Sequence, residues 1–334
     1  MAANDPSDWP GRWRFIVNPV AGAGDCGRRW PGIRALLAGA GVVGDVVLTR
    51  HPGDAVPLAA AAAATGEGLV AVGGDGTFSE VASGLLQSGP STSPLGLVPL
   101  GTGSDFARCL GIPRIEAAVE AFQGRCSRGV DVIRVECQGP NGPHTLHALS
   151  FAAAGISGEL LKRTTPRVKR WFGRRLAYYV GLVRALWHHR APWLRLQWDG
   201  GGQEGTYLFV GISNTEQAGG GMRLAPGAVP DDGQLNVTLV DALGRGETLR
   251  QLRLLSTGRH VEHPRVNYFP ATELAIHTDS PVEVQADGDN VGWTPASFRV
   301  VPGALRVVVP TGMAHAPRAE QSDRLGLPIS GAGC

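Results

Sequence analysis

Short apolar runs alternate with helical patterns over the first 137 residues, and this alternation limits the fold more than any other feature of the sequence. Strands that are connected through helices pair in parallel and are covered on both faces. We therefore expect a three-layer α/β domain over residues 12–137. The expected strands are Trp13–Val17, Val42–Leu48, Leu69–Val72, Leu95–Leu100 and Val130–Val135, and the expected helices are Arg28–Ala38, Ala55–Ala64, Phe78–Gln87 and Ile115–Phe122.

The pattern changes after Cys137, where short strands separated by Gly, Pro and Asp turns predict a β-rich, largely antiparallel second domain over residues 138–310. We expect its last strand, Leu305–Val309, to be able to return to the first domain. Helical stretches are expected from Ile156 to about His189 and over Glu247–Leu255. The tail, residues 314–334, has the polar composition of disordered termini. The expected strands are His144–Ala154, Trp193–Trp198, Thr206–Ile212, Leu235–Val240, Leu274–His277, Val282–Ala286, Ser297–Val301 and Ala304–Val309.

Composition argues against several classes of protein. The 334 residues include 31 Lys and Arg against 29 Asp and Glu, with no basic tract interleaved with aromatics, so we expect no nucleic-acid partner. Apolar runs are shorter than the roughly 18 residues of a membrane span. The start, Met1–Gly11, lacks the order of a secretion signal. We expect a cytoplasmic protein that can make peripheral contact with the inner face of the membrane.

The first glycine-rich loop, Asn18–Gly27, follows an expected strand and precedes an expected helix. Its glycines spell Gly-x-Gly-x-x-Gly, as in dinucleotide sites. The second strand, however, ends Leu48-Thr49-Arg50, without the acidic residue that such a site needs for the ribose. A dehydrogenase is therefore disfavoured, and a simple strand-to-helix turn remains an alternative for this loop.

The second loop, Gly73-Gly74-Asp75-Gly76-Thr77, leads directly into a helix. Glycines let the backbone approach an anion closely, and amides at a helix start point at phosphate. Because Asp75 would repel a bare phosphate, its presence indicates a divalent cation or a network that neutralises it. The third loop, Pro99–Arg108, repeats the order of strand, glycine-rich turn and short helix. Loops at the carboxyl ends of neighbouring parallel strands converge, so we expect one crevice.

These motifs resemble, in order and spacing, the diacylglycerol kinase catalytic-domain family, which includes soluble bacterial lipid kinases, sphingosine kinases and ceramide kinases. The resemblance rests on Asn18-Pro19-x-x-Gly22, Gly73–Thr77 and Pro99–Ala107. The second of these alone also resembles NAD kinases and is close to phosphofructokinases. Further on, Gly219–Ala228 followed by Asp231–Leu235 looks like the family's accessory magnesium loop, and Gln285–Asp289 looks like its Asp-Gly-Glu segment.

The resemblance implies a nucleotide domain like that of NAD kinases and phosphofructokinases, and an ATP- and Mg²⁺-dependent kinase. Such an enzyme transfers the γ-phosphoryl group to the hydroxyl of a membrane-presented lipid, with Asp289 as the general base and Asp75 near the phosphates and metal. It also implies an accessory Mg²⁺ at Val229, Asp232 and Gln234. The implied nucleotide-binding residues are Asn18, Pro19, Gly22, Thr49, Gly73, Gly74, Asp75, Gly76, Thr77, Thr102, Ser104 and Asp105.

Two positions depart from the family pattern: Ser104 stands where asparagine is usual, and Asp289 is one methylene shorter than glutamate. Two alternatives therefore stay open, an NAD kinase-type enzyme acting on a soluble nucleotide and a non-catalytic lipid- or nucleotide-binding relative. The basic cluster between Lys162 and Arg175, interleaved with Trp and Phe, suits an anionic membrane surface, while a solvated helix face explains it equally well.

Overall fold

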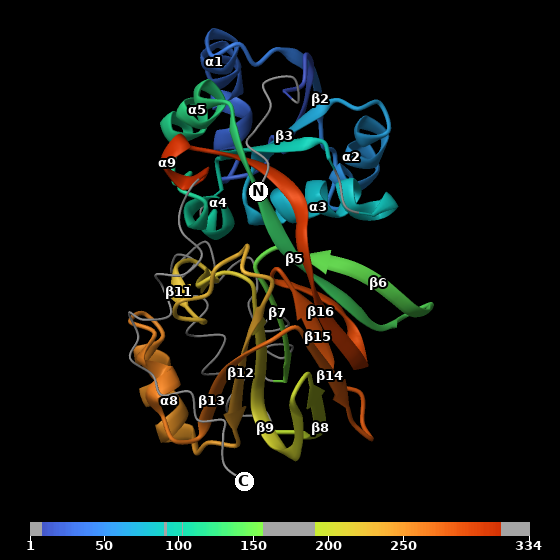
Figure 1. The fold of residues 1–334 in the computed structure, drawn as a ribbon, viewed down its shortest axis with the longest axis vertical. Helices are drawn as coiled ribbons and strands as arrows, with labels where there is room; N and C mark the ends of the chain where they lie inside the picture. The colour runs from blue at the N-terminus through green and yellow to red at the C-terminus, as the bar shows by residue number, and fades with distance from the viewer. Residues whose placement is uncertain (1–8, 90–91, 102, 156–190, 315–334) are drawn as a thin grey trace.

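A computed structural model shows the chain as two halves stacked end to end, the helices α1 to α5 in one and most of the strands in the other (Figure 1). The structure describes residues 9–89, 92–101, 103–155 and 191–314. The helical stretch expected from Ile156, the basic cluster within it and the tail from residue 315 lie outside the described residues. Within the described ranges, no helix has the length and apolar character needed to cross a membrane.

The first half is a parallel sheet with helices on both faces. Its strands lie in the order β4, β3, β1, β2, and every residue of β3 and β4 is buried. Helices α1 and α5 lie on one face, and α2 and α3 pack together on the other (Figure 1). The expected three-layer α/β fold is confirmed. The elements are β1 (Trp13–Val17), α1 (Asp25–Gly39), β2 (Gly44–Leu48), α2 (Ala55–Ala63), β3 (Gly68–Gly73), α3 (Asp75–Leu85), a 3-10 turn (Leu86–Ser88), β4 (Pro94–Pro99), α4 (Asp105–Cys109) and α5 (Ile115–Gly124).

The second half is built from antiparallel pairs, as expected. Buried side chains such as Leu196, Val210 and Phe298 form its core. Its elements are β6 (Gly142–Ala148), β7 (Phe151–Gly155), β8 (Trp193–Trp198), β9 (Gly201–Ser213), β10 (Gln217–Ala218), β11 (Met222–Arg223), β12 (Leu235–Asp241), α8 (Arg245–Leu254), a 3-10 helix (Arg259–Glu262), β13 (Val266–Ala271), β14 (Glu273–His277) and β15 (Glu283–Ala286).

Two long strands run through both halves (Figure 1). They are β5 (Cys126–Gly139) and β16 (Asp289–Val309), which pair antiparallel along most of their length. The end of β16 also pairs in parallel with β4, Val307 opposite Leu95, and its side chains lie in the core of the first half. The short helix α9 (Thr311–Ala314) follows. Because β5 and β16 are continuous, the division at residue 137 stays a prediction.

Three strand predictions need correction. The single strand expected over His144–Ala154 is two, β6 and β7, because the Asp287 carboxylate accepts the amides of Leu149, Ser150 and Phe151 at the break. The two strands expected over Ser297–Val309 are one, β16, whose pairing register shifts between Val301 and Leu305. The short strands β10 and β11 and the strand β13 were not expected; β13 contains Pro270, and proline is rare inside strands.

Candidate active site

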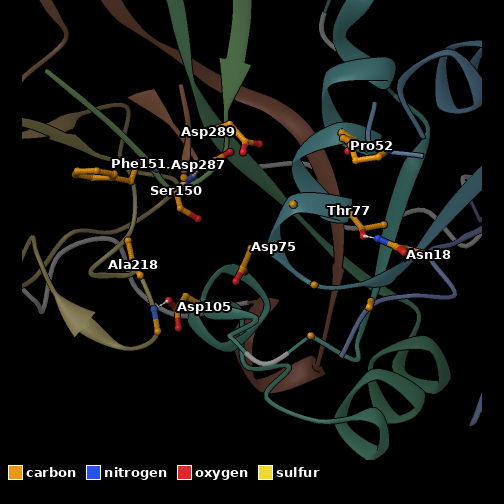
Figure 2. Close-up of a pocket in the computed structure, with 18 of the residues that line it drawn as sticks. Asn18, Pro52, Asp75, Thr77, Asp105, Ser150, Phe151, Ala218, Asp287 and Asp289 are labelled. Atoms are coloured by element: carbon orange, nitrogen blue, oxygen red, sulfur yellow. Dashed lines mark hydrogen bonds between the residues drawn. The ribbon is translucent and has the colours of Figure 1, made fainter. Parts of the chain in front are cut away.

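A cavity of about 520 Å³ lies between the two halves, at the carboxyl ends of the parallel strands. From the first half it is lined by the loops after β1, β2, β3 and β4, and from the second half by Ser150, Phe151 and the segments 218–224 and 285–289 (Figure 2). The structure thus brings together predicted residues from both ends of the chain. Those that line the cavity are Asn18, Gly22, Thr49, Gly74, Asp75, Gly76, Thr77, Asp105 and Asp289.

The three glycine-rich loops touch one another through their backbones. A Cβ on Gly101 would lie 2.5 Å from Gly74 Cα, and one on Gly22 would lie 2.5 Å from the Leu100 carbonyl oxygen. Gly22 also has a φ of +59°, which side chains resist. At Gly76, in contrast, a Cβ would meet nothing within 4 Å, and this residue lines the cavity. Glycine is therefore needed at Gly22 and Gly101 to bring the loops together.

Asn18 ties the first loop to the second. Its side-chain amide donates to Thr77 Oγ1 at 3.1 Å, its side-chain oxygen accepts the Val20 amide at 3.2 Å, and its backbone amide donates to the Val72 carbonyl. Thr77 is buried. The side chain of Asn18 thus fixes the loops beside the cavity as well as lining it.

Asp75 is the first residue of α3, and its carboxylate extends into the cavity between Asp105 on one side and Asp289 on the other (Figure 2). The carboxylate accepts the Phe106 amide at 3.1 Å, which links the second glycine-rich loop to α4. An acidic residue in the first turn of a helix is favoured by the helix dipole. The fold therefore holds a negative charge at the centre of the cavity.

Asp105 joins the two halves. It is 4% exposed, and its Oδ2 accepts the amides of Gly220 at 2.6 Å and Gly221 at 3.2 Å from the second half. Its Oδ1 accepts Arg108 Nη1 at 2.7 Å. The sequence predicted a nucleotide contact for Asp105; the structure adds a contact between the halves that the sequence did not indicate.

Asp289 is presented by a two-residue hairpin turn between β15 and β16. The turn residues Asp287 and Gly288 have φ values of +47° and +93°, and Ala286 pairs with Asp289 across it. Asp-Gly is favoured in such turns because both residues must adopt positive φ. Burial raises the pKa of Asp287, while hydrogen bonds from Leu149, Ser150, Ser79 and Phe151 oppose that rise. Asp289 itself is exposed at the cavity wall.

Three predicted residues lie behind the lining rather than in it. The Pro19 carbonyl accepts the Gly27 amide at 3.0 Å, and the Gly73 carbonyl accepts the amides of Leu100 and Gly101. Ser104 is 5% exposed, has a φ of +54°, and its Oγ has no hydrogen-bond partner in the described chain. These residues shape the loops. Thr102 lies outside the described residues.

Several residues that line the cavity were not predicted from the sequence, and Glu80 is the clearest of them. Its carboxylate accepts the amides of Gly53 at 2.9 Å and Ala55 at 3.2 Å, so it fixes the loop after β2 against α3. Helical spacing from Thr77, three residues earlier on the same face, was the signal that could have found it. Phe151, Met222 and Leu224 give the cavity an apolar side, and no motif marks them.

Comparisons with known proteins bear on the whole chain. The family described as "Diacylglycerol kinase catalytic domain" matches residues 12–135, and that described as "YegS C-terminal NAD kinase beta sandwich-like domain" matches residues 151–309. A protein named diacylglycerol kinase from Staphylococcus saprophyticus is 28% identical over 313 residues, covering 93% of this chain and 99% of its own. One of the same name from Staphylococcus aureus strain MRSA252 is 29% identical over 306 residues, 91% and 94% of the two chains.

The chain belongs to the diacylglycerol kinase catalytic-domain family. The fold agrees: a crystal structure of a "putative diacylglycerol kinase" from Bacillus anthracis Sterne superposes with a TM-score of 0.73 at 24% identity, covering 91% of this chain and 98% of that one. The resemblance inferred from the motifs is confirmed, and so is the prediction of a phosphotransferase with an alcohol acceptor.

The accessory metal site that the family suggests lies away from the cavity lining. The Gln234 amide donates to Asp232 Oδ1 at 2.9 Å, and burial together with the nearby charges of Asp131 and Asp231 raises the pKa of Asp232 to about 6. Asp231 is held by Arg128 at 2.6 Å. Among the described residues, no three His, Cys, Asp or Glu side chains are grouped to hold a metal ion. The site, with Val229 as its third member, stays a prediction.

The cavity suits the nucleotide that a kinase of this family uses. Its volume of about 520 Å³ falls within the range of roughly 300–1,000 Å³ usual for small-molecule sites. The start of α3 directs backbone amides and the positive end of its dipole toward the cavity, where Arg50 also lies. The Asp75 carboxylate beside them is a hard oxygen donor, of the type that Mg²⁺ prefers. These groups fit a nucleotide phosphate accompanied by Mg²⁺.

Proposed function

We propose that this protein transfers the γ-phosphoryl group of ATP, in the presence of Mg²⁺, to the hydroxyl of a membrane lipid. The observation that carries the proposal is the position of Asp289, an exposed carboxylate from the second half that lines the same cavity as the glycine-rich loop Gly73–Thr77 of the first half. Phosphoryl transfer needs mainly alignment and charge stabilisation, which opposed walls of one cavity can supply.

The nucleotide would occupy the side of the cavity formed by the first half. Backbone amides of Gly74–Thr77 would meet its phosphates, and Thr49 and Asn18 would lie alongside. Asp75 would hold the Mg²⁺ that accompanies ATP, and this ion neutralises phosphate charge when bound. Among the described residues that line the cavity, Arg50 is the one Lys or Arg side chain, so backbone amides would carry much of the phosphate binding.

The acceptor would enter from the apolar side. Ala218, Met222 and Leu224 form a small cluster with Phe151 and Leu255, and all but Leu255 line the cavity. Apolar side chains beside a polar centre suit a molecule with a hydroxyl headgroup and an acyl chain. The names of the Staphylococcus relatives make diacylglycerol the first acceptor to test, followed by a sphingoid base and phosphatidylglycerol.

Asp289 would act as the general base. The lipid hydroxyl oxygen would form a bond to the γ-phosphorus while the bond from that phosphorus to the β,γ-bridging oxygen breaks, and ADP would leave with that electron pair. Asp289 would accept the hydroxyl proton. It is the exposed carboxylate of the turn at Asp287–Asp289, whereas the Asp287 carboxylate is occupied by four donors.

Peripheral contact with an anionic membrane is part of the proposal, because the acceptor resides in a bilayer. The basic cluster between Lys162 and Arg175 is the segment of the sequence best suited to it. Each basic residue near an anionic surface contributes about 1 kcal/mol, and salt screens the contribution. The fraction of protein that sediments with anionic vesicles should therefore fall at high salt. Equal binding to neutral and anionic vesicles would contradict the electrostatic contact.

The test is a transfer assay with γ-labelled ATP and Mg²⁺. Vesicles of a total lipid extract, vesicles doped with diacylglycerol, and soluble NAD serve as separate acceptors, with Asp289→Ala as the control. We expect label in the lipid fraction and loss of that label in the control. Label in NAD alone would indicate an NAD kinase-type enzyme. ATP binding with no product in any arm would indicate a non-catalytic relative.

A further inference from the structure

Helix α3 contacts the second half through Ser79. Ser79 Oγ donates to Asp287 Oδ2 at 2.8 Å, joining residues 208 positions apart in the chain. No motif in the sequence marks this serine, and it is not among the residues that line the cavity. Asp287 is the first residue of the turn that presents Asp289 to the cavity, and Figure 2 shows the two aspartates close together.

The Asp287 carboxylate accepts four hydrogen bonds. Its Oδ2 takes Ser79 Oγ and the Leu149 amide at 2.7 Å, and its Oδ1 takes the amides of Ser150 at 2.9 Å and Phe151 at 3.2 Å. An ionised carboxylate offers about four such acceptor sites, so this side chain is fully satisfied in the charged form. Ser79 is the member of this set that comes from the first half.

Helix α3 also carries Asp75, the middle residue of the glycine-rich loop Gly73–Thr77. Asp75 and Ser79 are four residues apart in α3 and therefore lie on one helix face. Asp75 extends into the cavity, while Ser79 holds the turn residue two positions before Asp289. One rigid helix thus touches both groups that the proposed transfer must align.

We propose that Ser79 is a positioning residue that fixes the spacing between the Asp289 carboxylate and the loop Gly73–Thr77 through its hydrogen bond to Asp287. The inference rests on the proposed function, since it assigns Asp289 the role of base. A second contact between the halves, Asp105 with Gly220 and Gly221, lies at another side of the cavity. Without the Ser79 bond the halves stay joined there and through β5 and β16, so the loss is one of alignment.

Ser79→Ala and Ser79→Thr test the role, because alanine removes the hydroxyl and threonine keeps it. We expect Ser79→Ala to lower kcat for lipid phosphorylation about 10- to 100-fold, the range expected from losing a hydrogen bond to a charged group at an aligned site. The KM for ATP should change by less than about twofold, because the groups that bind ATP are untouched. Ser79→Thr should recover most of the rate.

Ser297→Ala is the matched control, since Ser297 Oγ also donates to a carboxylate, Glu136 Oε2 at 3.2 Å, on an exposed part of β16 outside the cavity lining. It should leave kcat unchanged. A Ser79→Ala enzyme with unchanged kcat, or one that threonine does not rescue, would overturn the positioning role.

Amide hydrogen exchange supplies a readout that needs no substrate. The amides of Leu149, Ser150 and Phe151 donate to Asp287, so they should exchange faster in Ser79→Ala than in the wild type and in Ser297→Ala. If the wild type phosphorylates no acceptor, the proposed function fails and this exchange alone decides whether Ser79 holds the turn. Unchanged exchange at these three amides would overturn the inference in either case.

Discussion

Gly74 and Gly101 meet backbone to backbone, so closely that a Cβ on Gly101 would lie 2.5 Å from Gly74 Cα. The contact joins the loop after β3 to the loop after β4 at the floor of the cavity. A second close contact joins the loop after β1 to the loop after β4, where Gly22 approaches the Leu100 carbonyl. The shape of the proposed phosphate site therefore depends on missing side chains as much as on those present.

Gly101→Ala should push these two loops apart, because the contact is with backbone that cannot rotate away. Overpacking of this kind costs about 1–3 kcal/mol of folding free energy, and the displaced amides should weaken ATP binding. Urea unfolding and ATP titration measure the two effects. Gly32→Ala is the control, since nothing lies within 4 Å of a Cβ at Gly32 in the exposed face of α1, and it should weaken neither.

The order of strands and glycine-rich loops could be predicted from the sequence because it depends on local patterns. Apolar runs separated by helices impose a parallel sheet, and a parallel sheet gathers the loops that hold Asn18, Asp75 and Asp105 at one edge. The contacts that join the halves could not be predicted in this way. Asp105 meets Gly220, 115 residues later, through a backbone amide, and almost any residue type supplies an amide.

The break between β6 and β7 is a second feature that local sequence patterns could not predict. His144–Ala154 has the composition of one strand, but distant residues bind its backbone at the break: the Asp287 carboxylate, 138 residues from Leu149, accepts the Leu149 amide, and the Asn214 side chain donates to the Leu149 carbonyl. The segment Asp287–Asp289 was recognised as a motif, yet nothing in its residue types distinguishes the roles of the two aspartates. Both aspartates line the cavity, and the structure separates them because the Asp287 carboxylate accepts hydrogen bonds from four donors, while Asp289 is exposed.

Asp105→Asn should loosen the contact between α4 and the glycine segment at 219–221. An amide in place of the carboxylate offers one acceptor oxygen and adds a donor, so it cannot reproduce the bonds to Gly220, Gly221 and Arg108 together. Hydrogen exchange over residues 217–224 should rise, and kcat/KM for both substrates should fall. Unaltered exchange in that segment would show that other contacts hold it.

His260 should make the protein less stable as pH falls. It is 5% exposed, and burial lowers its pKa to about 4 from the ordinary 6.5, although a hydrogen bond with the backbone of Leu224 opposes the change. Between these values the unfolded chain binds the proton and the folded chain does not, so stability is complete above pH 6.5 and decreases toward pH 4. The difference between the two pKa values corresponds to at most roughly 3 kcal/mol.

His260→Gln removes the titration and keeps a polar side chain that can hydrogen-bond the Leu224 backbone. The free energy of unfolding, measured in urea at several pH values from about 4.5 to 7.5, should vary less with pH in this variant than in the wild type. If the free energy of unfolding varies with pH equally in the two proteins, groups other than His260 cause the loss of stability at low pH. Because Leu224 lines the cavity, the same protonation should also disturb the apolar side of the proposed site.

Asp232→Asn tests the accessory Mg²⁺ site directly. If Asp232 binds Mg²⁺ with the backbone carbonyls of Val229 and Gln234, adding Mg²⁺ without nucleotide should raise the thermal midpoint of the wild type and leave that of the variant unchanged. The Mg²⁺ dependence of activity should also shift to higher concentration in the variant. Equal midpoints and equal Mg²⁺ dependence in both proteins would remove the site.

Asp289 allows the sharpest test of the proposed chemistry. Loss of a positioned base lowers rate by about 10²–10⁴-fold, so Asp289→Ala should lower kcat by that range while ATP affinity, set by the other half, stays nearly the same. Asp289→Asn keeps the size of the side chain and removes its basicity, so its kcat should fall by a factor similar to that of Asp289→Ala. Full activity in either variant would exclude Asp289 from the reaction.

Asp289→Glu tests whether the cavity is shaped to fit the shorter side chain of aspartate. The turn is fixed at its back by the four hydrogen bonds to Asp287, so it cannot retreat to make room for an extra methylene. If the cavity is shaped around aspartate, glutamate overshoots the hydroxyl and kcat falls. Because the turn also carries the Ser79 contact, combining Asp289→Glu with Ser79→Ala should then recover part of the rate, as the released turn can move back. A rate that rises in Asp289→Glu alone would instead identify the aspartate as a weakened base.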